Sequence, residues 1–344
     1  MQKIVVFLTV ILVLLMAGCI GDQKSKSYND KGLELYNQGN YVDSISEYNL
    51  ALLENPKSAE IWVNKGNSLL KLGIYGESTE CFDKALLIDP ENSEAFNGLG
   101  TVLSKTGNYQ KALEMYDKSL NIDSENSEAW KNKGITLNNM QRYSEAIDCF
   151  DKSISINAKN SDVWYNKGET QFKLGEYEKS IDSYNKALLI DEKMETALLG
   201  KGNSYLKLQN YESAIECFNT AETINPKSEY PPYYKADAYR DTENFEYALK
   251  YYDEALEINP SNSDILISKG ICLDKMKNYS AAISNFDLAI QLDPKNVQIW
   301  ILKGNSYVGL KDYESSISCY KKALEIEPKN ENAKENIDII EKII

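Results

Sequence analysis

The sequence predicts an all-α protein built as a solenoid of helical hairpins, and two observations predict this fold class. First, a small residue recurs every 34 residues along most of the chain, as glycine at positions 32, 66, 100, 134, 168, 202, 270 and 304 and as alanine at position 236. Second, small or aromatic residues follow each of these positions at offsets of 9, 12, 16 and 19 residues. Spacings of three and four residues are helical and never alternate, which excludes strands.

Nine 34-residue repeats tile the chain without an insertion, at 25–58, 59–92, 93–126, 127–160, 161–194, 195–228, 229–262, 263–296 and 297–330. In the third repeat, Asn92 and Ser93 offer caps for a first helix that extends to Thr106. Gly107 and Asn108 then form a stop signal, and a second helix extends to Ile122. A lone hairpin leaves one apolar face in water, so stability depends on the neighbouring repeat.

The last repeat needs a lid with one polar face, and residues 331–344 are expected to supply it as a C-terminal capping helix. The small and apolar side chains of this segment fall on one helical stripe, namely Ala333, Ile337, Ile340 and Ile344.

The N-terminus has the pattern of an export signal. A short positive start is followed by an apolar run over residues 4–16, which is too short for a comfortable membrane span of about 20 residues. The run ends in Leu15-Met16-Ala17-Gly18-Cys19, which resembles a lipobox, although Met16 stands where leucine is usual.

The lipobox resemblance implies that residues 1–18 are a signal peptide, that Cys19 is lipidated, and that residues 19–27 form a tether overlapping the first repeat. The protein is then exported and lipid-anchored on the outer face of the cytoplasmic membrane. An ordinary secretory signal and an uncleaved anchor remain as alternatives.

Composition excludes several kinds of chemistry. The chain has no histidine, which removes Ser-His-Asp triads, Cys-His pairs and imidazole metal ligands. A formal charge of −14, with Arg142 and Arg240 as its two arginines, argues against a nucleic-acid surface. No Cys-x-x-Cys occurs, and the regular spacing of most internal cysteines indicates equivalent places in the repeat rather than a zinc site or disulfide framework; the residues are Cys81, Cys149, Cys217, Cys272 and Cys319. No metal or cofactor is therefore expected.

The repeat resembles the tetratricopeptide repeat. One repeat shows the pattern as Trp130, Gly134, Tyr143, Ala146 and Phe150. The resemblance implies helix–turn–helix hairpins in a right-handed superhelix, with the first helices lining a concave groove that binds partners. The groove face predicted for the second to fourth repeats is Val63, Asn67, Leu70, Asn97, Thr101, Ser104, Lys131, Ile135 and Asn138.

The seventh repeat departs most from the pattern, with Tyr230-Pro231-Pro232-Tyr233-Tyr234 and with Ala236 in the glycine place. Prolines are tolerated at a helix start, and tyrosine is a favoured contact residue. We expect a binding patch of Tyr230, Tyr233 and Arg240 beside Tyr165 and Phe172; the alternative is a locally repacked joint. The full set of groove candidates is Tyr165, Phe172, Leu199, Leu206, Tyr230, Tyr233, Asp237 and Arg240.

Two weaker features were weighed. A lysine precedes most comb positions, as a ladder for an acidic ligand or, more simply, as stems that cover apolar surface and heads that pair with carboxylates. Asn278-Tyr279-Ser280 is a glycosylation sequon at a helix–helix turn.

These features favour a non-catalytic adaptor, anchored at a membrane, that binds a peptide or protein segment and helps assemble envelope complexes. The alternative is a binder of a cell-envelope glycan or polymer, for which the tyrosines of the groove are the support. An enzyme is disfavoured because the sequence has no phosphate loop, activated nucleophile or metal cluster.

Overall fold

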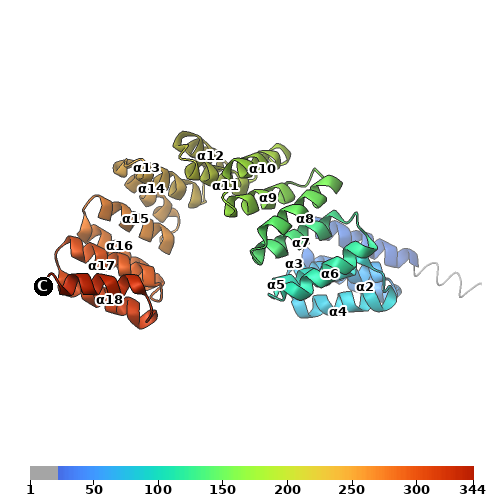
Figure 1. Cartoon of the computed structure of the whole chain (residues 1–344). Coiled ribbons are helices and arrows are strands. Elements are labelled where there is room, and N and C mark those ends of the chain that lie inside the picture. The colour runs from blue at the N-terminus through green and yellow to red at the C-terminus, as the bar shows by residue number, and fades with distance from the viewer. Residues whose placement is uncertain (1–21) are drawn as a thin grey trace, which may run out of the picture. The chain divides into compact units, whose positions relative to one another are not determined.

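The computed structural model describes residues 22–344, and the predicted signal peptide and Cys19 lie outside them. Within this range every regular element is a helix and no strand occurs. The predicted all-α solenoid of helical hairpins is thereby confirmed (Figure 1).

The chain divides into two compact units, residues 1–174 and 175–344, which we call unit 1 and unit 2. Their boundary lies between the two helices of the fifth repeat. In unit 1, residues 22–37 are helical, and the following helices are α2 (Tyr41–Glu54), α3 (Ala59–Lys71), α4 (Tyr75–Ile88), α5 (Ser93–Lys105), α6 (Tyr109–Ile122), α7 (Ser127–Asn139), α8 (Tyr143–Ile156) and α9 (Ser161–Lys173).

Unit 2 continues the same alternation of first and second helices. Its helices are α10 (Tyr177–Ile190), α11 (Glu195–Lys207), α12 (Tyr211–Ile224), α13 (Tyr230–Asp241), α14 (Phe245–Ile258), α15 (Ser263–Lys275), α16 (Tyr279–Leu292), α17 (Val297–Gly309), α18 (Tyr313–Ile326) and α19 (Glu331–Glu341).

Packing inside each unit is between neighbours. A first helix packs on the second helix of its own repeat, as α5 does on α6, and that second helix packs on the next first helix, α7. First helices also contact one another along one side, as in α3 with α5 and α5 with α7. This side, made of first helices alone, is where a groove can form.

The 34-residue glycine column exists because an aromatic ring occupies the space where a side chain would be. A Cβ atom added at Gly66 would lie 2.7 Å from the Phe82 ring, and one at Gly134 would lie 2.7 Å from the Phe150 ring. Both rings are fully buried. The glycine lets the two helices of a hairpin approach, and the aromatic residue fills the junction between them.

Helix ends follow the chemistry of caps and turns. The Asn92 side chain accepts a hydrogen bond of 2.9 Å from the Ala95 N–H, and Asn126 and Asn330 cap their helices in the same way. The turn between the helices of a hairpin needs one residue in the left-handed region. Gly107 fills it with φ +81°, whereas Gln141 holds the equivalent position at φ 61°.

The chain ends in the expected capping helix, α19, which packs on α18. Ala333 and Ile340 are buried in this contact, and Ile337 packs against it. The helix ends at Glu341, one turn earlier than the predicted stripe requires, so that Ile344 lies beyond it and is exposed.

Candidate functional site

A groove lies on the first-helix side of unit 1. Residue Tyr36 of the N-terminal helix, together with side chains of α3, α5 and α7, lines a cavity of about 420 Å³. Tyr116 of the second helix α6 reaches it from below. The cavity is open to solvent along the helices, a form that suits an elongated ligand.

The sequence-predicted face forms most of this lining. The predicted residues at the cavity are Asn67, Leu70, Asn97, Thr101, Ser104, Lys131 and Ile135. Two predicted residues are not at the cavity. Val63 is buried in the core, and Asn138 accepts a hydrogen bond of 3.3 Å from the Thr170 hydroxyl.

Amide and hydroxyl groups are held in fixed orientations at the floor of the groove. The Asn132 Nδ2 donates to Asn97 Oδ1 at 3.1 Å and to Thr101 Oγ1 at 3.4 Å. Tyr116 donates its hydroxyl to the same Thr101 oxygen at 3.4 Å, and burial raises the pKa of Tyr116, which keeps that hydroxyl protonated. An asparagine side chain both donates and accepts, so this floor can pair with either group of a peptide bond.

Lysines give the groove a charge opposite to that of the whole chain. Lys71 and Lys105, each in the last turn of a first helix, are exposed at the groove and form no ion pair within residues 22–344. Lys131 pairs with Glu128 at 2.6 Å. The lining thus holds three ammonium groups and one carboxylate, in a chain with a formal charge of −14.

Sequence reasoning missed the rim of the groove. The rim residues Lys71, Lys105 and Asn139 stand five residues after the comb glycine, one turn beyond the predicted face. Because residues three to four apart share a helix face, extending the predicted face by one turn would have included this column.

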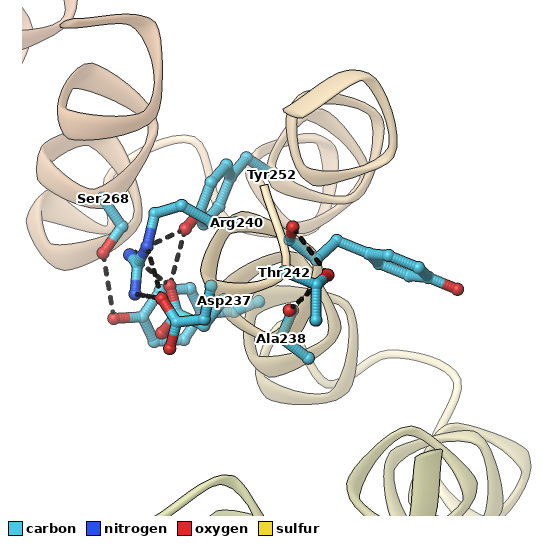
Figure 2. Close-up of polar contacts among 9 residues, drawn as sticks. Asp237, Ala238, Arg240, Thr242, Tyr252 and Ser268 are labelled. Carbon is cyan, nitrogen blue, oxygen red and sulfur yellow. Dashed lines mark hydrogen bonds and ion pairs between the residues drawn. The ribbon is translucent and has the colours of Figure 1, made fainter. Parts of the chain in front are cut away.

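In the seventh repeat, the structure gathers several predicted residues into a buried polar cluster (Figure 2). Arg240 donates to Asp237 at 2.7 Å and to the Tyr252 hydroxyl at 3.0 Å, and Tyr252 donates to Asp237 at 2.6 Å. Burial raises the pKa of Asp237, and the Arg240 guanidinium opposes that rise. Burial first, and then the Asp237 carboxylate, raise the pKa of Tyr252, which therefore stays a donor.

The tyrosines of this repeat have different surroundings. The Tyr233 and Ser268 hydroxyls lie 3.3 Å apart, and burial raises the pKa of Tyr233 to about 12. The Tyr233 ring lies 6.3 Å from the Tyr252 ring, whereas Tyr230 keeps 44% of its surface exposed. The other candidates are divided between the units: Tyr165 and Phe172 lie on α9 of unit 1, and Leu199 and Leu206 are half-buried on α11 of unit 2.

The lysine column is engaged by neighbouring side chains. Six of its members pair with carboxylates, namely Lys31, Lys133, Lys167, Lys235, Lys269 and Lys303. Lys65 lies over the Trp62 ring and Lys201 over the Tyr205 ring, at 5.4 and 5.9 Å. This arrangement matches the simpler interpretation of the column.

The remaining predicted residues were placed as follows. All five described cysteines are free and buried, and burial raises the pKa of Cys149 to about 11. The exposed Asn278 caps α16, its side chain accepting from the Ala281 N–H at 3.4 Å. Across residues 22–344, no group of three or more cysteine or acidic side chains is placed to hold a metal ion. In the same range, no helix has the length and apolar character needed to cross a bilayer.

The fold and groove define a class, that of α-solenoid binding scaffolds, in which first helices present a ligand surface. Profiles described as tetratricopeptide repeat match residues 127–160, 161–194, 196–228 and 297–330, residues 57–125, and residues 233–297. These matches together cover more than half of the chain, which therefore belongs to the tetratricopeptide repeat family. Comparison with curated protein sequences found no match.

Solved structures show the same fold. The APC/C hetero-tetramer Cut9-Hcn1 aligns with a TM-score of 0.57 and 18% identity over 83% of this chain, which spans only 56% of that one. A tetratricopeptide repeat protein from Parabacteroides merdae aligns with a TM-score of 0.52 and 19% identity over 82% of this chain and 98% of that one. Yeast Tom70 aligns with a TM-score of 0.50 and 15% identity over 93% and 96%.

Proposed function

We propose that this protein is a non-catalytic, exported scaffold, anchored to a membrane through Cys19, that binds a peptide or protein segment in the unit 1 groove. The observation that carries the proposal is the groove itself, with its oriented amides and unpaired lysines. Family membership supports the scaffold role, because stacked helical repeats provide extended concave surfaces for binding. A role in assembling envelope complexes follows from the proposed location.

The groove chemistry supports a polypeptide ligand. The backbone of an extended peptide presents a donor and an acceptor at each residue, and the side chains of Asn67, Asn97 and Asn139 offer both. Leu70 and Ile135 add apolar contacts between these polar groups. Because the two rim lysines have no partner of their own, the expected segment carries acidic side chains or a free carboxylate near them.

Export and anchoring rest on the sequence before the first repeat. The apolar run over residues 4–16 and the Leu15–Cys19 motif are separated from Asp22, the first described residue, by two residues. Mass spectrometry of the N-terminal peptide tests this part. We expect a chain that begins at an acylated Cys19. An unmodified peptide that begins at Met1 would contradict it.

Quantitative affinity capture tests the groove. Tagged full-length protein is purified from membranes after crosslinking, and the captured polypeptides are compared with those of a Lys71→Glu/Lys105→Glu variant. We expect the yield of specific partners to fall by about tenfold or more, the equivalent of roughly 1.4 kcal/mol. The matched control is Lys111→Glu/Lys152→Glu, which makes the same charge change at exposed positions on the second helices α6 and α8.

Equal yields from the two double variants would contradict a groove site. Capture of no polypeptide, together with binding to a glycan array, would replace the proposal with the envelope-glycan alternative. The comparison with Cys19→Ala separates the two parts, since loss of the anchor removes membrane recovery and leaves the groove intact.

A further inference from the structure

The outer face of α2 differs from that of every other second helix. Residues that point away from the core recur at i, i+4, i+7 and i+11, which on α2 are Val42, Ser46, Asn49 and Leu53. None of the four is charged, whereas each of the other eight second helices carries at least one charged residue at the equivalent positions. Val42 is 61% and Leu53 79% exposed, and the neighbouring Leu50 is 40% exposed.

The start of the described chain lies at the same end of this hairpin. The Ser25 hydroxyl donates to the Ala51 carbonyl at 2.9 Å, and the Asn55 side chain donates to Asp22 at 3.5 Å. Residues 22–25 therefore run beside the last turn of α2, where Leu53 is exposed. Cys19 is three residues from Asp22, a separation that an extended chain spans in at most about 11 Å.

Basic groups surround this corner. Lys24 and Lys26 flank Ser25, and Lys57 follows Asn55 in the turn after α2. All three are exposed, and none forms an ion pair with another residue in the described part of the chain. The carboxylates at the same corner are Asp22 and Glu54. Exposed leucines with a rim of unpaired lysines are the side chains that bind the interface of an anionic bilayer.

From this placement we propose that the outer face of α2, with Leu50 and Leu53 at its centre, lies against the lipid surface that holds the anchor. The inference rests on the proposed lipidation of Cys19, since the short connection brings this face to the headgroups. An acyl anchor alone leaves the repeats free to rotate about the tether. Contact through α2 instead fixes the first repeat on the membrane.

Site-specific fluorescence in vesicles tests the contact. The full-length lipidated protein carries Leu53→Cys, labelled with an environment-sensitive maleimide, in vesicles of phosphatidylcholine and phosphatidylglycerol. The matched control is Leu189→Cys, which occupies the same repeat position on α10 and is 83% exposed. The labelled parent measures any reaction of the buried native thiols.

The predicted result is a blue-shifted probe at position 53 that loses fluorescence to nitroxide-labelled phospholipid, with neither change at position 189. A Lys24→Glu/Lys26→Glu/Lys57→Glu variant is expected to lose part of that quenching. Vesicles that float with the protein while both probes respond alike would overturn the α2 contact and leave anchoring intact. A blue-shifted probe at 53 that lipid nitroxides fail to quench would also overturn it, because protein would then cover the face. Protein that does not float would instead refute anchoring itself.

Discussion

The hydroxyl of Tyr48 is buried without a hydrogen-bond partner, so its removal should not destabilise the protein. Tyr48 is fully buried, and its Oη has no partner within the described residues. The partner seen in other repeats comes from the residue after the comb glycine: Tyr320 donates to Asn305 at 2.7 Å, and Tyr252 to Asp237 at 2.6 Å. In the first repeat that place is held by Leu33, which packs in the core.

The magnitudes follow from what each hydroxyl contacts. A buried polar group left unpaired costs about 1–3 kcal/mol, so Tyr48→Phe should raise the free energy of unfolding by up to about 1 kcal/mol. Tyr320→Phe loses a neutral hydrogen bond and should lower it by about 0.5–1.5 kcal/mol. Tyr252→Phe loses bonds to two charged side chains and should lower it by about 1.5–3 kcal/mol. Phenylalanine fits the site, since Phe82 and Phe150 fill the same position fully buried.

Denaturant titration followed by circular dichroism measures these differences, with hydrogen exchange of residues 41–54 as the local measurement, because repeat arrays can lose stability one repeat at a time. A control adds Leu33→Asn in both backgrounds. It should cost less when Tyr48 is present to donate to the new amide than when Phe replaces it. A Tyr48→Phe variant that loses as much stability as Tyr252→Phe would refute the reasoning.

Three further predictions concern stability. Gln141→Gly should raise the free energy of unfolding by about 0.5–1 kcal/mol, and Gly107→Ala should lower it by about 1 kcal/mol, because both positions are left-handed; denaturant titration checks the two signs. Arg240→Met should cost about 3 kcal/mol or more by leaving Asp237 buried without its cation, and adding Asp237→Asn should recover part of the loss in thermal unfolding. Because burial raises the pKa of Cys149 to about 11, the unfolded chain loses this proton first, and stability should fall as pH rises from about 8.5 towards 11; Cys149→Ser should flatten that slope.

Local helix boundaries were predictable from the sequence because they depend on nearby residues. Asn92 and Gly107 bound the first helix of the third repeat at the places expected, and α6 ends at Ile122 as predicted. The capping helix shows the limit of this reasoning. An apolar stripe continues to Ile344 in the sequence, but α19 ends at Glu341 and Ile344 is exposed.

Side-chain partners were harder to predict, because they join residues far apart in sequence. Arg240 and Asp237 could be assigned to one helix face, yet the pairing with Tyr252, twelve and fifteen residues further on, fixes their orientation. The boundary between the two units at Leu174 was also not predicted. The columns of small and aromatic residues run through it unbroken, so no local signal marks it.

Site-specific photo-crosslinking in intact cells tests the central claim most directly. A benzophenone amino acid replaces Lys105 at the groove or, as the matched control, Lys111 on the outer side of α6; both lysines are exposed. We predict that irradiation joins a distinct polypeptide to position 105 and not to position 111. Crosslinks of equal yield at both positions, or at position 111 alone, would contradict a scaffold that binds its partner in the unit 1 groove.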